Sequence, residues 1–254
     1  MIKNKNKKAQ ITIFIILALI LVVGIIFIFL LRQGSKIEVA DEENPQSFIE
    51  SCTRDAVEEA VSVLSEQGGG IIPEGSTMFK GKNITYLCYN ANFYEPCIMQ
   101  RPDLITHIET EIVSYIKPRV NNCFQVLKAE LEPRYEVEID ENWDLTTKLM
   151  PNIIEININR DFKMQRGDSV RNFDVFKIKV MHPMYNLAEV AMEIANQEAI
   201  YCNFDTLGYM IFYPDYDLDK FRPGKGDVIY QLKHIPTNQR FVFAIRSCAL
   251  PPGF

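Results

Sequence analysis

The sequence contains few of the residues and motifs that usually mark a catalytic or metal-binding site. Only three histidines occur among 254 residues, and His107, His182 and His234 lie far apart with no motif around them. No two cysteines have the C-x-x-C spacing of zinc or thioredoxin-like sites. The G-x-S-x-G and H-E-x-x-H motifs are absent, and the glycines at 68–70 lack the lysine and helix of a P-loop. The sequence therefore predicts no enzyme, no cofactor and no bound metal.

The chain also lacks an excess of basic residues. It has 27 lysines and arginines against 33 acidic residues, which gives a net charge of −6. Five of the basic residues fall within the first 32 positions, so the rest of the chain carries 22 basic and 33 acidic residues, a net charge of −11. Nucleic-acid-binding proteins present a basic face. The composition thus argues against nucleic acid as a partner.

An uninterrupted apolar run, without a charged side chain, extends from Ile11 to Leu31. A helix of this length reaches roughly 31 Å, the thickness of the hydrocarbon core of a bilayer. We expect residues 11–31 to be a transmembrane helix in contact with membrane lipid. The alternative is a removed secretory signal peptide, but its apolar region would be only about 7–15 residues long.

Charges on the two sides of the apolar run predict its orientation. Four lysines precede it within residues 1–10, and an acidic stretch follows in residues 32–44. Because lysine and arginine favour the cytoplasmic side, residues 1–10 should be a cytoplasmic tail or leader. The chain is therefore expected to be a single-pass protein of the cell membrane, with its C-terminal domain extracytoplasmic and residues 32–44 as an acidic linker.

Six cysteines occur, all of them after the apolar run. An even number on the exported side of a membrane predicts disulfides, although buried free thiols are an alternative. Spacing alone does not select among the fifteen pairings that six cysteines allow. Local features favour three pairs. Cys88 and Cys97 flank a turn-rich stretch, and Cys52 and Cys123 fall in two helices that could lie side by side. Cys202 and Cys248 would join the end of the last helix to the C-terminal strand.

Helical periodicity predicts three amphipathic helices, at about residues 45–67, 102–127 and 184–199. Asn44 and Pro45 form a typical helix start, with asparagine as the cap and proline in the first turn. Pro118 is expected to kink the second helix or to restart it. Residues 45–132 should accordingly form a helical N-terminal part of the extracytoplasmic domain.

From residue 134 the hydrophobic period changes to two. Ile154, Ile156 and Ile158 alternate with polar residues, which is typical of an antiparallel strand with one face covered. Further strands are expected at about residues 209–213, 228–234 and 240–247. Residues 133–254 should thus be rich in sheet. The predicted fold class is α+β, with about three helices packed on one face of a mainly antiparallel sheet.

Asp215, Asp217 and Asp219 have the spacing that begins a calcium-binding loop. The rest of that motif is missing, because Lys220 stands where glycine is needed and Gly226 stands where a glutamate closes the site. Nearby prolines favour an exposed acidic loop instead. This cluster is therefore not assigned to a metal.

Two further motifs have an ordinary structural interpretation beside a functional one. The sequence Arg166-Gly167-Asp168 is identical to an adhesion tripeptide, but residues of this kind are also what a tight hairpin turn requires. Asn83 begins an N-x-T glycosylation sequon on the predicted outer side. We expect the first to be a turn and keep Asn83 as a glycosylation candidate.

The residues in front of the apolar run, Lys7-Lys8-Ala9-Gln10, resemble the class III signal of archaeal type IV pilin-like proteins. The resemblance implies that a prepilin-type peptidase cleaves between Ala9 and Gln10 and that the apolar helix stays on the mature chain. Phe14 departs from the pilin pattern, in which glutamate usually occupies the fifth mature position. This departure favours a membrane-retained or minor subunit.

A longer series of segments resembles a family of uncharacterised envelope proteins of small-genome archaea. The segments are Phe48–Cys52, Gly68–Pro73, a second helix ending near Cys123, and Phe241–Arg246. The resemblance implies a single-pass surface protein and supplies no activity.

Together these features predict a non-enzymatic, membrane-anchored surface protein that acts in envelope assembly, a pilus-like structure or cell attachment, with other envelope or pilus subunits as partners. One alternative is a sensor domain that binds a solute or cation. Its support is an aromatic-rich stretch beside the aspartates: Tyr209, Phe212, Tyr213, Tyr216 and Phe221. A less favoured alternative is an envelope hydrolase, which would require His182 or His234 to share a pocket with a carboxylate partner.

Overall fold

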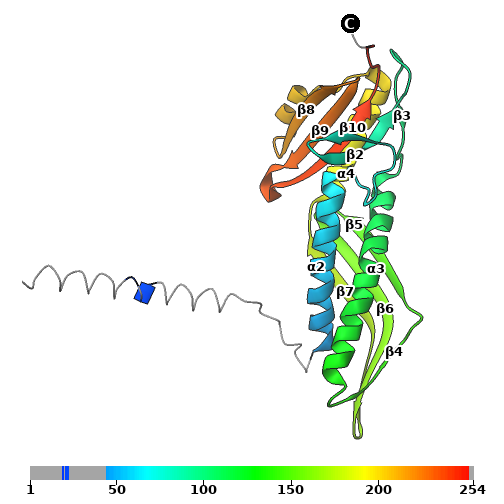
Figure 1. Ribbon diagram of the computed structural model, residues 1–254, viewed down its shortest axis with the longest axis vertical. Helices are drawn as coiled ribbons and strands as arrows, with labels where there is room; N and C mark the ends of the chain where they lie inside the picture. The colour runs from blue at the N-terminus through cyan, green and yellow to red at the C-terminus, as the bar shows by residue number, and fades with distance from the viewer. Residues whose placement is uncertain (1–18, 20, 23–43, 252–254) are drawn as a thin grey trace, which may run out of the picture. The chain divides into compact units, whose positions relative to one another are not determined.

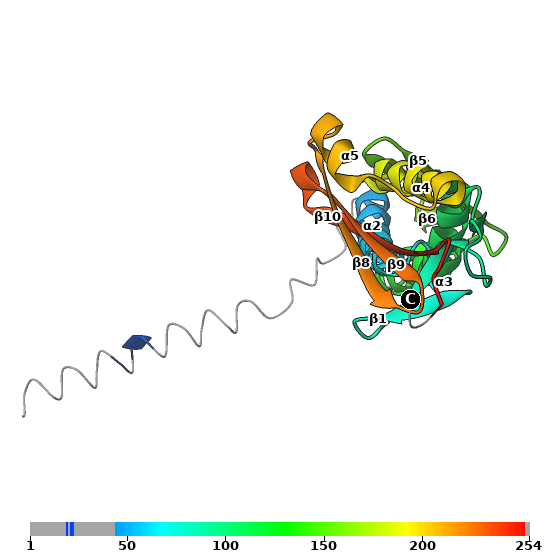
Figure 2. The same cartoon turned by 90° about the horizontal axis from the view of Figure 1, so that it is seen from above.

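The computed structural model describes residues 19, 21, 22 and 44–251 (Figures 1 and 2). The predicted cytoplasmic tail with Ala9 and Gln10, nearly all of the apolar run and most of the acidic linker lie outside these residues and stay predictions. Among the residues that are described, no helix is both long and apolar enough to cross a membrane. The chain divides into two units, 1–41 and 42–254, and the fold described below belongs to the second.

Two long helices, α2 (Pro45–Glu66) and α3 (Leu104–Leu131), run side by side (Figure 1). The side chain of Asn44 caps α2 by accepting a hydrogen bond from the backbone N–H of Ser47 at 3.3 Å. Pro118 does not restart the helix, because α3 continues through it, and a kink there stays a prediction. Buried residues keep the helical period on both sides of this exposed proline, so packing outweighs the lost backbone hydrogen bond.

A four-stranded antiparallel sheet lies against these two helices (Figure 1). Its central strand β6 pairs along one edge with β4 and β5 and along the other with β7. Ile154, Ile156 and Ile158 are fully buried beneath the helices, as the period of two predicts. The strands are β4 (Glu136–Ile139), β5 (Asp144–Met150), β6 (Ile153–Arg166) and β7 (Ser169–Met181).

A second sheet of six strands follows the order β1-β2-β10-β9-β8, with β3 also beside β2. Its strands are β1 (Ser76–Phe79), β2 (Lys82–Tyr89), β3 (Ile98–Met99), β8 (Tyr216–Gly224), β9 (Asp227–His234) and β10 (Gln239–Arg246). All neighbours are antiparallel except β2 and β10, which are parallel. Helix α4 (Met184–Tyr201) packs on this sheet (Figure 2). The fold class α+β is confirmed, but two sheets replace the single expected one.

The stretch from Thr206 to Tyr216 also differs from the prediction. The expected strand at 209–213 is instead the short helix α5 (Thr206–Phe212), which Asp205 caps by accepting from the N–H of Gly208 at 3.1 Å. The expected acidic loop at 214–223 is largely strand β8. The signal for β8 was the buried Leu218 between exposed aspartates, an alternation that two prolines in the stretch concealed.

Candidate functional site

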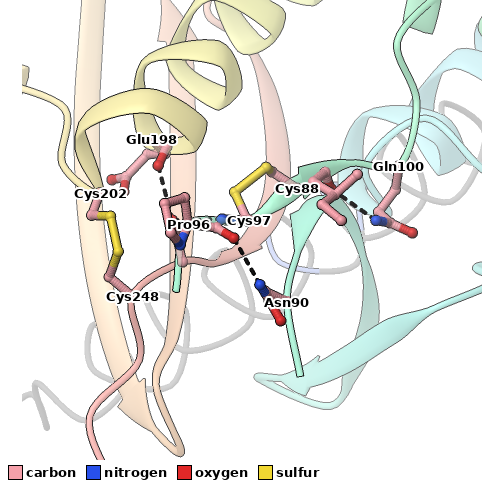
Figure 3. Close-up of a disulfide and its surroundings, with 10 residues drawn as sticks. Cys88, Asn90, Pro96, Cys97, Gln100, Glu198, Cys202 and Cys248 are labelled. Atoms are coloured by element: carbon pink, nitrogen blue, oxygen red, sulfur yellow. Dashed lines mark hydrogen bonds between the residues drawn. A yellow bond between two sulfur atoms is a disulfide. The ribbon is translucent and has the colours of Figure 1, made fainter. Parts of the chain in front are cut away.

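All six cysteines are paired in three disulfides, Cys52–Cys123, Cys88–Cys97 and Cys202–Cys248. This is the pairing expected from the sequence. The last two disulfides lie close together, with Pro96 between them (Figure 3). The first of these two closes the loop at residues 90–97 onto β2, and the second joins the end of α4 to the chain after β10.

The loop at residues 90–97 is held at several points besides its disulfide. The side-chain amide of Asn90 donates to the carbonyl of Pro96 at 2.8 Å (Figure 3). The backbone N–H of Tyr94 donates to the carbonyl of Ala249 at 3.0 Å, and that of Cys248 donates to Glu95 at 2.7 Å. The loop is therefore fixed against the C-terminal segment.

A β-bulge in β2 rearranges the side chains next to this loop. Tyr86 pairs with Ala244 and Cys88 pairs with Ile245, so Leu87 is one extra residue in the ladder. The bulge brings Tyr86 and Tyr89 onto the same face, with ring centroids 4.8 Å apart. Bulges are known to re-aim side chains near functional sites.

Tyr86 and Tyr89 are shared by two neighbouring cavities of about 450 and 520 Å³, which we call the tyrosine groove. The first cavity is lined mainly by the two tyrosines with Phe93, Lys225, Asp227 and Arg246. The second adds Glu74, Gln100 and Arg101. The groove thus has an aromatic centre, with one arginine and one carboxylate on each side.

Asp227 is 7 % exposed and lines the first cavity. Its carboxylate accepts hydrogen bonds from the hydroxyls of Tyr86 at 2.8 Å and Thr77 at 2.9 Å. Burial and this bond raise the pKa of Tyr86 well above its usual value, so the phenol remains a donor at neutral pH. Two neutral donors thus hold the carboxylate in place.

Arg246 is 9 % exposed and lines the same cavity. Its Nε donates to the carbonyl of Lys225 at 3.2 Å, and Nη1 donates to the carbonyl of Asn90. Its guanidinium carbon lies 5.8 Å from the ring centre of Tyr89 and 5.3 Å from that of Phe93. Within residues 44–251 it forms no direct ion pair, although Asp227 lines the same cavity.

The second cavity contains a similar arginine. Nη1 of Arg101 donates to the carbonyl of Gln100 at 3.1 Å, and Nη2 lies 3.9 Å from Glu74. Its buried Nε has no hydrogen-bond partner in the described part of the chain. A buried unpaired donor is unfavourable unless water or a ligand satisfies it.

A cavity of about 650 Å³ lies between α2, the end of β7 and the β9–β10 hairpin, and its lining includes His182 and Glu66. Burial lowers the pKa of His182, and among the described residues its Nδ1 has no hydrogen-bond partner. Burial alone would raise the pKa of Glu66, but hydrogen bonds from Lys82 and Arg240 outweigh it and lower the pKa. Two carboxylates line the cavity with His182: Glu66, which is engaged by two cations, and the exposed Glu58.

The other two histidines lie elsewhere. His234 contacts the hydroxyl of Thr237 through Nδ1 at 2.8 Å. His107 lines a separate cavity of about 510 Å³ behind the glycine loop, and burial lowers its pKa. The three histidines are not brought together.

Asp217 and Asp219 of the calcium-like motif are exposed on β8, and Asp215 directly precedes this strand. Across residues 44–251, no cluster of three or more histidine, cysteine or acidic side chains is placed to hold a metal ion. Nor do the nearby aromatics form one site. Tyr209 stacks on Tyr213 at 4.5 Å, whereas Phe221 packs on Phe79 of another strand at 5.4 Å.

The remaining motifs lie on the surface. Arg166 and Ser169 pair across the tight turn between β6 and β7, as the turn prediction requires. Asn83 is exposed on β2, opposite Met78 of β1. Its side chain is accessible for glycosylation, which stays a prediction.

The tyrosine groove was missed by the sequence analysis. Its residues come from β2, from the segments on either side of β2 between Glu74 and Arg101, and from positions 225–246, and no motif joins them. The fold and groove together define a disulfide-linked α+β protein with a pre-formed cavity. A scan against models of known protein families found no match, and neither did searches of curated proteins and of solved structures.

Proposed function

We propose that the chain is a non-enzymatic surface protein, anchored in the cell membrane by residues 11–31, whose disulfide-linked domain acts outside the cell. The observation that carries this proposal is that all six cysteines form disulfides in the unit that follows the apolar run. Disulfides persist in oxidising compartments and are rare in the cytosol. The lysines before the run support the same orientation.

The proposed role is in envelope assembly, a pilus-like structure or cell attachment, with other envelope subunits as partners. A prepilin-type peptidase would remove the leader after Ala9 and leave Gln10 at the mature N-terminus. The apolar helix would then remain as the anchor.

A second candidate function is capture of a solute, and the tyrosine groove favours it. Its walls are pre-formed by a disulfide and by backbone hydrogen bonds, which lowers the ordering cost of binding. The hydrolase alternative has weaker support because Glu66 is engaged by Lys82 and Arg240. In addition, Nδ1 of His182 has no hydrogen-bond partner among the described residues, so it is not paired with Glu58 or Glu66.

The proposal is tested with the full chain in its own cells. We expect it in the membrane fraction, labelled by a membrane-impermeant amine reagent on intact cells, and unreactive toward maleimide until reductant is added. Leu21→Arg should weaken membrane retention, because arginine at the centre of a span costs about 2.5–3.5 kcal/mol. Leu21→Ala is the matched control and should remain in the membrane.

Three results would contradict the proposal: recovery of the wild type in the soluble fraction, absence of surface labelling, or maleimide modification without reductant. Mass spectrometry of the mature N-terminus tests the processing separately. Chains that begin at Gln10 support peptidase cleavage, whereas chains that begin at Met1 exclude it and leave the anchor standing.

A further inference from the structure

We infer that the tyrosine groove binds acidic sugar residues, that is, pyranose rings that carry a carboxylate, within an extracellular polysaccharide chain. The inference deepens the proposed function and rests on it for access to such polymers.

The aromatic centre favours a ring-shaped ligand. The rings of Tyr86 and Tyr89 lie 4.8 Å apart between centroids and are tilted by 52°. Tyr86 is only 9 % exposed, so the half-buried Tyr89 and the 42 % exposed Phe93 supply most of the accessible aromatic surface. Aromatic side chains provide rigid apolar contact area at a site where polar groups fix orientation. A pyranose ring matches this arrangement, because its C–H faces are apolar and its edge carries hydroxyls.

The cations favour an anionic group on that ring. Arg246 is buried, lines the first cavity and forms no ion pair within the described residues, and the exposed Lys225 lies beside it. Nε and Nη1 of Arg246 are engaged by backbone carbonyls, whereas Nη2 makes no hydrogen bond within the described residues and can donate to a ligand carboxylate. Asp227 in the same cavity disfavours a doubly charged phosphate by repulsion. A single carboxylate therefore fits the balance of charge best.

The same contacts disfavour a cationic ligand. Aromatic cages bind alkylammonium groups over their ring faces. Here the guanidinium of Arg246 already lies over the rings of Tyr89 and Phe93. A second cation would meet both Arg246 and Lys225 at close range.

The carboxylates of the groove can accept hydroxyls. An ionised carboxylate offers about four lone-pair sites, and Asp227 uses two of them for Tyr86 and Thr77. Glu74, which is highly exposed, lies in the second cavity at 3.9 Å from Arg101. Both carboxylates thus have acceptor capacity for the hydroxyls of a sugar.

The division of the groove indicates more than one sugar residue. The two cavities, of about 450 and 520 Å³, share Tyr86 and Tyr89, and each has its own arginine and carboxylate. Two consecutive acidic residues of one chain would place one ring on each side of the tyrosine pair. We therefore expect oligomers to bind more tightly than the single sugar.

The experiment measures binding by calorimetry with the purified full chain in detergent micelles. The probes are trimers of galacturonate, glucuronate and mannuronate, with maltotriose as the neutral chain of equal length. At least one acidic trimer should bind about tenfold or more tightly than maltotriose, with an affinity that falls as salt is added. Sodium phosphate and acetate are the controls for simple anion binding.

Tyr89→Leu keeps an apolar side chain and removes the aromatic face, so binding should fall about tenfold. Its matched control is Tyr135→Leu, because Tyr135 also has a guanidinium 5.8 Å from its ring centre, that of Arg166, but lies outside the groove. Tyr135→Leu should bind like the wild type.

Lys225→Asn removes an exposed charge and should weaken binding about threefold to tenfold while reducing its salt dependence. Lys225 has a left-handed backbone with φ of 57°, which asparagine tolerates. Lys80→Asn is the matched control, because Lys80 is also exposed and has φ of 48° but does not line the groove. This pair keeps the location testable even if Tyr89→Leu unfolds the protein.

The inference is wrong if no acidic trimer binds, if maltotriose binds equally well, or if acetate competes as strongly as the trimer. Binding that both Tyr89→Leu and Lys225→Asn leave unchanged would place the site elsewhere and also overturn it. None of these results bears on membrane retention or surface labelling. Failure of the sugar site is therefore distinguishable from failure of the proposed function.

Discussion

Removing the disulfide between α2 and α3 should destabilise the domain more than removing the one beside the groove. Cys52 and Cys123 are 71 residues apart, and releasing a loop of that length corresponds to about 4.4 kcal/mol in the loop-closure model. Cys88 and Cys97 are 9 residues apart, which corresponds to about 2.6 kcal/mol. We expect the two double alanine variants to lose unfolding free energy in this order.

Trp143, the only tryptophan, gives a local signal for the assay. Its ring centre lies 5.2 Å from Nζ of Lys117 in α3 and 4.8 Å from the guanidinium carbon of Arg160 in β6. Separation of α3 from the sheet should therefore change its fluorescence. Urea titrations of the full chain in detergent micelles, without reductant, give the unfolding free energy of each variant.

Packing differences do not account for the predicted order. Three of the four cysteines concerned are at most 6 % exposed, and Cys52 is half-buried, so the two variants lose similar amounts of buried sulfur. The third disulfide, Cys202–Cys248, spans 46 residues and should fall between the others at about 4.0 kcal/mol. If the 9-residue loop proved the most important of the three, loop entropy would not govern their contributions and the reasoning would be refuted.

Three further predictions concern single residues. Glu198→Ala removes the acceptor 2.8 Å from Lys220 Nζ and leaves that nearly buried cation without an ionic partner. The unfolding free energy measured in urea should fall by about 3–5 kcal/mol. As the control, Glu193→Ala at an exposed position of the same helix should change it by less than about 0.5 kcal/mol. Pro118→Ala restores a backbone donor inside α3 and should raise the unfolding free energy by about 1–3 kcal/mol, seen as a higher melting temperature. Burial lowers the pKa of His182 in the folded state. The neutral imidazole therefore contributes its full stabilisation above the unfolded pKa of about 6.5, and this stabilisation is lost as the pH falls through the lower folded pKa. His182→Gln should thus flatten the fall of the urea midpoint on acidification.

Local signals were sufficient for the elements that carry a long hydrophobic pattern. Asn44 with Pro45 and the three glycines at 68–70 bound α2, and the alternating isoleucines of β6 give its buried face. The helices in turn place Cys52 and Cys123 on neighbouring elements, which is why their pairing could be predicted. In each case the residues that decide the structure are close in sequence or lie on one long element.

The prediction failed where the arrangement depends on distant partners. Tyr209–Tyr213 is rich in residues with high β-propensity, yet Asp205 caps a helix there, because a local cap decides so short a segment. The parallel pairing of β2 with β10 joins residues about 158 positions apart, as Ala244 with Tyr86 shows. No local pattern indicates such a pairing, so the division into two sheets was not predictable.

The tyrosine groove depends on this same distant pairing. In a regular strand, Tyr86 and Cys88 would share one face and Tyr89 would lie on the other. The extra residue Leu87 exchanges the faces on which Cys88 and Tyr89 lie, so that Cys88 pairs with Ile245 and Tyr89 pairs with Arg246. One bulge therefore turns Cys88 away from the groove and brings Tyr89 into it. The Cys88–Cys97 disulfide and the tyrosine pair at the centre of the groove both require this extra residue. A change that restored regular pairing in β2 would therefore disrupt both.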